Sequence, residues 1–198
     1  MSHDLHSIRD LPGLAGVMLA TCESADQIDA TAVRLPAGTP IVAHIESALG
    51  IEHAYAIAIA AGTRRLALIG GGVVRRNSSA KYDPPRLAHH RSRLVVASRA
   101  AALPGPIDGP TIPDGAITLM TDLDDDNQLG VTAKLCTRTH DAPVINRAFR
   151  PSSREIAWAA IIINEHSDDG KRVGDGSDLF TLAHARRITH LAKVYNDH

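Results

Sequence analysis

Glu46 is the residue of this sequence whose type and position most clearly suggest chemistry. It directly follows residues 41–45, the short apolar run IVAHI, which is typical of a buried strand. In α/β proteins, ligand-binding and catalytic groups are found where such strands end. A lone carboxylate at this position could bind a hard divalent cation. It could equally cap the helix that follows, and the residues alone leave both interpretations open.

Residues 75–99 form a strongly basic stretch. They contain seven Lys or Arg residues and one Asp, which gives a local net charge of +6. Such a stretch could bind phosphate groups, and Arg75 and Arg76 are its candidates for binding a cofactor. The alternative is an exposed helix face whose charge is balanced by the acidic segment at residues 122–126.

That acidic segment resembles a calcium-binding loop at first sight, because Asp122, Asp124 and Asp126 alternate along it. An EF-hand loop needs Gly at its sixth position and Glu at its twelfth, where this chain has Asn127 and Ala133. We therefore reject a calcium loop. We expect a solvated acidic turn or the start of a helix instead.

Two other motifs that often carry chemistry do not qualify. Cys22 and Cys136 lie far apart in the sequence and form no CxxC pair, so we expect two buried or semi-buried thiols. The glycines at residues 70–72 follow an apolar run, but the third glycine of the dinucleotide fingerprint is absent. We expect a flexible turn there.

Composition places the chain among ordinary globular proteins. It has 198 residues, of which 44% are hydrophobic and 22% charged. The net charge of −1 argues against a nucleic-acid-binding protein. There is no run of about 18 apolar residues, so we expect no transmembrane helix and no membrane partner. The polar N-terminus MSHDLHSIRD has no apolar core like that of a signal peptide, which favours a cytoplasmic location.

Short apolar runs alternate with longer helical patterns along the chain. The runs predict strands at residues 14–19, 41–45, 65–69, 109–112 and 133–136. The helical patterns predict helices at residues 24–33, 51–61, 86–103, 142–149, 152–163 and 178–195. Ser24 is the expected N-cap of the first of these helices. Alternating strands and helices indicate an α/β fold with a mostly parallel sheet of about five strands.

Several segments, in chain order, resemble the citrate lyase beta subunit-like proteins of the HpcH/HpaI aldolase superfamily. Residues 40–50, PIVAHIESALG, are similar to the family's fifth strand, which reads like IPLIETARG. Residues 16–25 resemble the fourth strand with the helix after it, and residues 91–101 resemble a family helix with the pattern aRs…aaRaaGl. Further matches are Ile107-Asp108-Gly109, Leu129-Gly130, Lys134-Leu135-Cys136, and residues 143–146 and 149–159.

This resemblance implies a TIM-barrel-like (β/α) fold that acts on acyl-CoA thioesters. Family members cleave or form a carbon–carbon bond of a 3-hydroxyacyl-CoA, such as citryl-, malyl- or citramalyl-CoA, and use Mg²⁺ held by one Glu and one Asp. Glu46 stands at the position of that metal Glu. Asp178 best matches a C-terminal Asp that acts as acid or base in a neighbouring subunit's site. On this resemblance we predict that Asp178 and Lys134 are catalytic and that the chain forms a homo-oligomer.

The sequence departs from the family pattern at the second metal ligand, where Val73 stands in place of the family's Asp. Glu23, His44 and Asp83 are candidates to replace it. The alternative function is therefore a catalytically impaired homologue that binds CoA esters or pairs with a full-length lyase.

A second departure concerns the barrel itself, because the family's first three strands have no counterpart here. Five strands cannot close an eight-stranded barrel. We expect a partial (β/α) barrel over residues 1–150, with about five of eight strands, followed by a C-terminal helical segment over residues 151–198.

Overall fold

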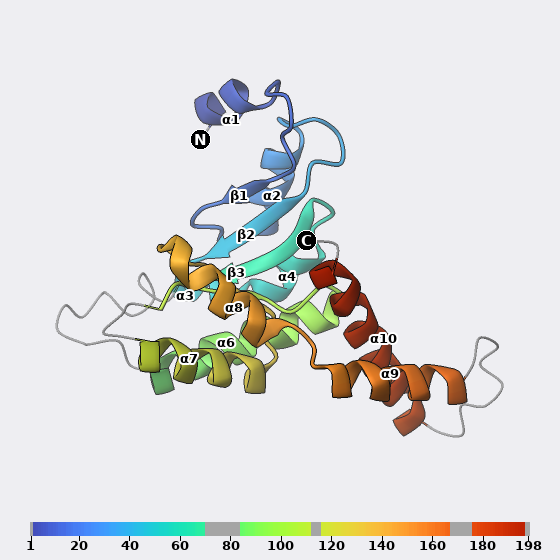
Figure 1. The fold of residues 1–198 in the computed structure, drawn as a ribbon. Helices are drawn as coiled ribbons and strands as arrows, with labels where there is room; N and C mark the ends of the chain where they lie inside the picture. The colour runs from blue at the N-terminus through green and yellow to red at the C-terminus, as the bar shows by residue number, and fades with distance from the viewer. Residues whose placement is uncertain (1, 70–83, 112–115, 167–175, 197–198) are drawn as a thin grey trace. The chain divides into compact units, whose positions relative to one another are not determined.

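The computed structural model describes residues 2–69, 84–111, 116–166 and 176–196. The chain divides into two compact units, Met1–Ile145 and Asn146–His198. The first unit contains a parallel sheet with helices, and the described part of the second is helical (Figure 1). None of the described helices is both long enough and apolar enough to span a bilayer.

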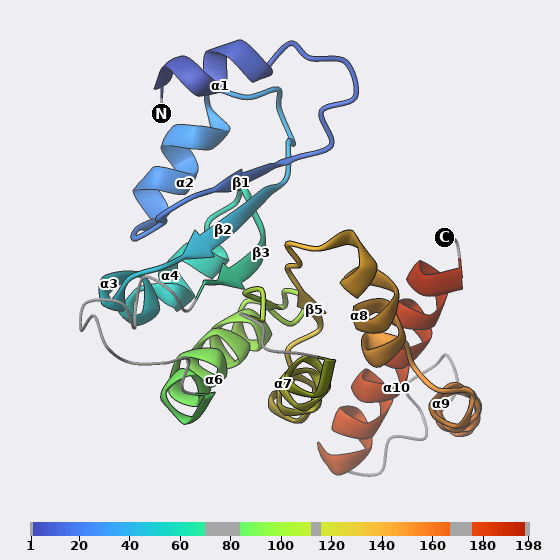
Figure 2. The same cartoon turned by 60° about the vertical axis from the view of Figure 1, so that its left-hand side comes forward.

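The sheet has five parallel strands whose order in space is their order in the chain. They are β1 (Val17–Leu19), β2 (Ile41–Ile45), β3 (Thr63–Leu68), β4 (Ile107–Asp108) and β5 (Ala133–Lys134). Figure 2 shows β1, β2 and β3 side by side. The strand order of a doubly wound sheet would reverse at a switch point, and this order does not. The predicted parallel α/β sheet of five strands is confirmed.

The helices of the first unit follow the strands. They are α1 (Ser2–Ile8), α2 (Ala25–Ala32), α3 (Ala48–Glu52), α4 (Ala54–Ile59), α6 (Pro84–Ala100), α7 (Ala116–Leu129) and the short 3₁₀ helix η1 (Thr139–Asp141). The second unit contains α9 (Ser153–Glu165) and α10 (Gly176–Asn196), and α8 (Ala142–Phe149) crosses the boundary between the units. Ser24 is the N-cap of α2, as predicted, with Gln27 completing a capping box.

Three sequence predictions need correction. The helix expected at 51–61 is two helices that meet at His53. The fourth strand lies at Ile107–Asp108 and not at 109–112, because Gly109-Pro110 follows and proline cannot donate to a strand ladder. Cys22 is buried as expected, whereas Cys136 is exposed, since it follows the end of β5.

The two faces of β2 have different surroundings. Ile41, Ala43 and Ile45 point to one face and belong to an apolar core with residues of α2, α3, α4 and α6. Because side chains alternate along a strand, His44 points to the opposite face, and it is also buried. Burial on both faces explains why β2 reads as a continuous apolar run.

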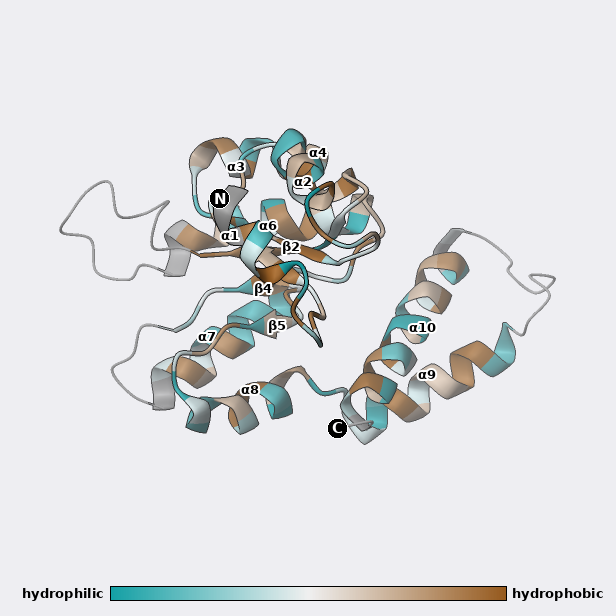
Figure 3. Ribbon diagram, turned by 90° about the horizontal axis from the view of Figure 1, so that it is seen from above, coloured by the Kyte–Doolittle hydropathy of each residue, from teal (hydrophilic) through white to brown (hydrophobic). Residues whose placement is uncertain are grey.

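The second unit is held together by the packing of α9 against α10. Its buried core consists of Ala159, Ala185 and Ile188, with partly buried isoleucines of α9 around it. Figure 3 shows apolar segments on both helices. Ser152 begins α9 with a capping box, in which its hydroxyl accepts from the Glu155 amide and the Glu155 carboxylate accepts from the Ser152 amide.

Candidate active site

Glu46 lies immediately after β2, at the carboxyl edge of the sheet. Its carboxylate oxygen Oε1 is 2.9 Å from Nδ1 of His44 and accepts a 3.3 Å hydrogen bond from the Thr21 amide. The Glu46 side chain is 28% exposed, so it is held by the protein and still reachable. The structure therefore fixes one oxygen of a carboxylate at the edge where ligands of such sheets bind.

Thr21 reaches Glu46 through an unusual backbone conformation. It follows β1 and has a φ of 51°, in the left-handed region that β-branched residues rarely adopt. Its amide is nevertheless committed to the Glu46 carboxylate. Backbone strain of this kind is concentrated at functional sites, which supports a functional reading of the Glu46 carboxylate.

The helix-cap interpretation of Glu46 is wrong, because Ser47 caps the next helix. The Ser47 hydroxyl accepts a 3.1 Å hydrogen bond from the Gly50 amide at the start of α3. The same hydroxyl donates to Oε1 of Glu23 at 2.5 Å. The Glu46 carboxylate is thus left for another role.

Glu23 lies at the same edge of the sheet, where both its side chain and its backbone make hydrogen bonds. Its amide donates to Oε1 of Gln27 at 2.6 Å, and its carbonyl oxygen lies 2.8 Å from Nδ1 of His53. Of the three candidates for a second metal ligand, His44 contacts Glu46 directly and Glu23 is linked to its neighbour Ser47. The third, Asp83, lies outside the described residues, as does Val73.

His44 is the least solvated polar side chain next to Glu46, with 9% of the side chain exposed. Burial lowers the pKa of His44, and the nearby Glu46 carboxylate opposes that change only in part. Its Nε2 atom is buried and has no hydrogen-bond partner among the residues that the structure describes. Burial therefore favours the neutral form of the imidazole.

A second group of charged residues joins the helices α6 and α7 to the strands β4 and β5 and is called here the ionic cluster. It consists of Arg91 of α6, Asp108 of β4, Asp122 and Asp126 of α7, and Lys134 of β5. Lys134 Nζ lies 2.7, 2.7 and 2.8 Å from oxygens of the three carboxylates. The Arg91 guanidinium bridges the same three carboxylates at 2.7 to 3.3 Å.

Charge in the ionic cluster does not balance if every group is ionised, since three carboxylates face two cations. The pKa of Asp126 is raised to about 7. Burial is the main cause and the nearby Asp108 the second, while the two cations act in the opposite direction. Burial alone would lower the pKa of Lys134, but the carboxylates around it raise that pKa above its ordinary value. Lys134 therefore stays protonated, which favours a structural role over proton transfer.

The three aspartates of the ionic cluster have the geometry of a metal site, with oxygens within 4.8 Å of one another. The Lys134 ammonium already lies among them, and it supplies the positive charge that a metal ion would bring.

Burial also corrects two sequence interpretations. Asp122 and Asp126 are 3% and 0% exposed, so the segment is not a solvated turn. Arg91 of the basic stretch does pair with the acidic segment, as the charge-balance interpretation predicted. Arg91 is only 2% exposed, however, so this part of the helix face is buried and not exposed.

Three predicted site residues remain, namely Asp178, Arg75 and Arg76. Asp178 is in the first turn of α10, with its Oδ1 3.6 Å from Nε2 of His166. It belongs to the second unit, whereas Glu46 belongs to the first. Arg75 and Arg76 lie outside the described residues.

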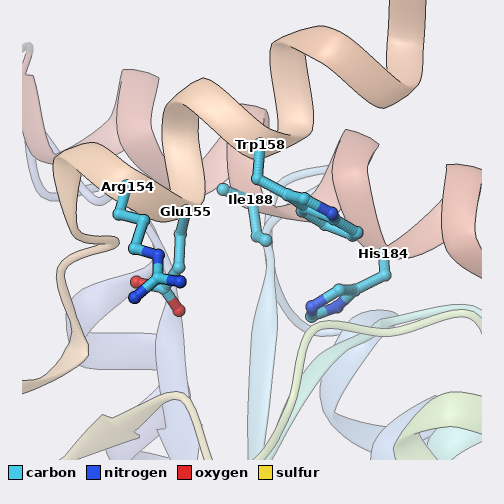
Figure 4. A pocket seen from close by; sticks show the side chains of 5 residues that line it. All are labelled: Arg154, Glu155, Trp158, His184 and Ile188. Carbon is cyan, nitrogen blue, oxygen red and sulfur yellow. The ribbon is translucent and has the colours of Figure 1, made fainter. Parts of the chain in front are cut away.

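The second unit also carries a shallow pocket of about 310 Å³, which sequence reasoning missed. Figure 4 shows its lining by Arg154, Glu155, Trp158, His184 and Ile188. The Trp158 and His184 rings are in contact, with centroids 5.5 Å apart and planes tilted by 54°. The Glu155 carboxylate is committed to the N-terminal cap of α9. These residues come from two helices, α9 and α10, and meet only when the helices pack. No sequence motif predicts that arrangement.

Comparisons with known proteins agree with this fold. A family model, the HpcH/HpaI aldolase C-terminal domain, matches residues 154–196. A citrate lyase subunit beta-like protein of Mycobacterium tuberculosis is 30% identical over 207 residues, which cover 93% of this chain and 71% of that protein.

Solved structures give the same result. RipC from Yersinia pestis is similar with a TM-score of 0.70 and 26% identity, over 78% of this chain and 73% of that one. CitE of Mycobacterium tuberculosis, in complex with magnesium, acetoacetate and coenzyme A, is similar with a TM-score of 0.68 and 24% identity. That match covers 97% of this chain and 73% of the CitE chain.

The parallel sheet wound in chain order with its helices, together with the likeness to these solved structures, defines an α/β protein of the TIM-barrel-like class. The fold class predicted from the sequence is thereby confirmed. Within that class, the chain belongs to the citrate lyase subunit beta-like family of HpcH/HpaI aldolases.

Proposed function

We propose that this protein is a Mg²⁺-dependent carbon–carbon lyase that cleaves or forms a 3-hydroxyacyl-CoA of the citryl-, malyl- or citramalyl-CoA type. The observation that carries the proposal is the Glu46 carboxylate, held through Oε1 by His44 and Thr21 at the carboxyl edge of the sheet. Membership of the citrate lyase subunit beta-like family supports it, as do magnesium and coenzyme A in the CitE structure.

The residues around Glu46 fit a magnesium ion. Mg²⁺ prefers oxygen ligands and commonly uses one or two carboxylates together with water and substrate oxygens. Among the described residues, the Thr21 amide and Nδ1 of His44 both contact Oε1 of Glu46, which leaves Oε2 for a cation. Glu23, which accepts a hydrogen bond from the neighbouring Ser47, is the described candidate for a second carboxylate. When bound, the ion would polarise substrate oxygens and stabilise the enolate character of the acyl-CoA product.

Cleavage of a 3-hydroxyacyl-CoA also needs proton transfer. A base takes the proton of the 3-hydroxyl as the bond between C2 and C3 breaks, and an acid returns a proton to C2 of the acyl-CoA. Asp178 is the proposed acid or base, acting in the site of a neighbouring subunit of a homo-oligomer. Arg75 and Arg76 are proposed to bind the phosphates of CoA. Lys134 stays a predicted catalytic residue, although its burial in the ionic cluster favours positioning of the β4 and β5 strands.

A second candidate function is a catalytically impaired homologue that binds CoA esters or pairs with a full-length lyase. The observation that favours it is Val73, an apolar residue at the position of the family's second metal ligand. One carboxylate would then hold Mg²⁺ more weakly than two.

Activity of the purified protein separates the two functions. We expect Mg²⁺-dependent cleavage of malyl-CoA or citramalyl-CoA, with kcat/KM lowered at least about 100-fold in Glu46→Gln because that variant loses the metal-binding charge. Asp124→Asn, an exposed carboxylate on α7, is the matched control and should retain full activity. Absence of turnover in the wild type, together with binding of acetyl-CoA seen as a raised melting temperature, would favour the impaired homologue.

A further inference from the structure

His44 and Glu46 form a close contact that the family resemblance does not predict. The two residues are separated by one position, so both side chains project from the same face at the end of β2. Nδ1 of His44 lies 2.9 Å from Oε1 of Glu46, which is hydrogen-bond distance. The family pattern IPLIETARG has an apolar leucine where this chain has His44, so the pair is a feature of this sequence.

The protonation of the imidazole follows from its contacts. A carboxylate only accepts hydrogen bonds, so a contact as short as 2.9 Å favours a proton on Nδ1 of His44. Nε2 then carries a lone pair. If Nδ1 instead bound a cation, the proton would move to Nε2, which is buried and has no acceptor among the described residues. Metal-bound histidines usually donate that proton to a partner, so the surroundings of Nε2 disfavour direct ligation.

We propose that His44 is a positioning residue, whose Nδ1–H donates to Oε1 of Glu46 and so turns Oε2 toward a divalent cation. This inference rests on the proposed metal-binding role of Glu46. The Thr21 amide donates to the same oxygen, and the two donors together fix the plane of the carboxylate. Orienting partners of this kind contribute substantially to metal affinity, because a free carboxylate must lose rotational freedom when it binds.

The test is a titration with Mn²⁺ alone, in which electron paramagnetic resonance measures the free ion, on the wild type and three variants. His44→Asn places an amide N–H near the position of Nδ1 and should keep the affinity within about threefold. His44→Leu fills similar space without a donor and should weaken binding about tenfold or more. Glu46→Gln should abolish binding. Equal losses in His44→Asn and His44→Leu would overturn the inference, as would unchanged affinity in His44→Leu.

A measurement without metal separates failure of this inference from failure of the proposed function. Nitrogen-15 NMR of the imidazole should find the proton of His44 on Nδ1, and the Glu46 carboxylate carbon should change its chemical shift in His44→Leu. A proton on Nε2 with none on Nδ1 would overturn the inference whatever the protein binds. If the tautomer is as expected but the wild type binds no Mn²⁺, the positioning contact stands and the proposed metal-dependent function fails.

Discussion

At the scale of single residues, Asp126 is the group whose protonation couples most directly to folding. It is fully buried, and its pKa is raised from 3.8 to about 7 by burial first and by Asp108 second. An acid whose folded pKa is raised stabilises the fold fully below its unfolded pKa, and that contribution is lost as pH rises toward the folded pKa. The free energy of unfolding should thus fall between about pH 4 and pH 7 through this group.

Asp126→Asn should remove that pH dependence. Urea unfolding at pH 5, 6, 7 and 8 would measure it, and the wild type should lose up to about 1.4 kcal/mol per pH unit more than the variant between pH 5 and 7. Asp124→Asn, exposed on the same helix, is the control and should follow the wild type. Parallel pH profiles for the wild type and Asp126→Asn would contradict a raised pKa.

Some site residues could be read from the sequence and others could not. Glu46 was found because it ends an apolar run, and apolar runs are visible in a sequence. The two groups that hold it were not predicted in that role, since the amide of Thr21 carries no residue-type signal and His44 was predicted only as a candidate second metal ligand. Asp122 and Asp126 lie four residues apart, a helical spacing that could have predicted a shared face of α7. The alternation with Asp124 concealed that spacing.

At the scale of elements, the contact between α3 and the loop after β1 holds the candidate site together. Gly50 of α3 is buried, and a Cβ on it would lie 2.7 Å from the Cys22 carbonyl oxygen and 3.0 Å from Ile45 Cγ2. This close approach places Ser47 where it can bond to Glu23. Backbone cannot move as easily as a flexible side chain, so an added methyl group must separate the two segments.

Gly50→Ala should therefore destabilise the protein by about 1–3 kcal/mol through overpacking. Gly176→Ala is the matched control, because a Cβ there meets nothing within 4 Å, and it should change stability by less than about 1 kcal/mol. Urea unfolding of both variants measures the difference. Equal stability of the two variants would mean that α3 can shift away from Cys22 at little cost.

The elements themselves were predictable where local pattern and environment agree. The strand at 41–45 and the helix at 142–149 have the predicted bounds, because an apolar run and an amphipathic period define them. The break at His53 was not predictable, since its ring is held by the Glu23 carbonyl oxygen, a contact across 30 positions of sequence. Tertiary contacts of this kind override local pattern.

At the scale of the whole molecule, the second unit carries apolar side chains that a monomer would leave in water. Phe180 and Leu179, next to Asp178 on α10, are 81% and 57% exposed. Adjacent exposed apolar side chains often mark an interaction surface, and large aromatics often dominate the energy of interfaces. This supports the proposed homo-oligomer.

Phe180→Ser should weaken self-association about tenfold or more, equivalent to a loss of about 1.4 kcal/mol. Sedimentation velocity over a range of protein concentrations measures it. Val33→Ser is the control, since Val33 is 80% exposed in the first unit, and it should leave the association unchanged. Unaltered sedimentation of Phe180→Ser, or a monomeric wild type at every concentration, would count against this surface as an interface.

The ionic cluster also restricts how this protein can change through evolution. Each of its two cations serves the same three buried carboxylates, so a substitution that removes either cation leaves buried carboxylates without enough positive charge to balance them. Removing one partner of such a group typically costs about 3–5 kcal/mol, whereas replacing the whole group by apolar residues can be neutral. Replacement of the whole group by single substitutions must pass through variants that have lost one partner, and those variants are strongly destabilised. The five positions should therefore be inherited as a block among relatives, kept together or exchanged together, independently of whether those relatives are active lyases.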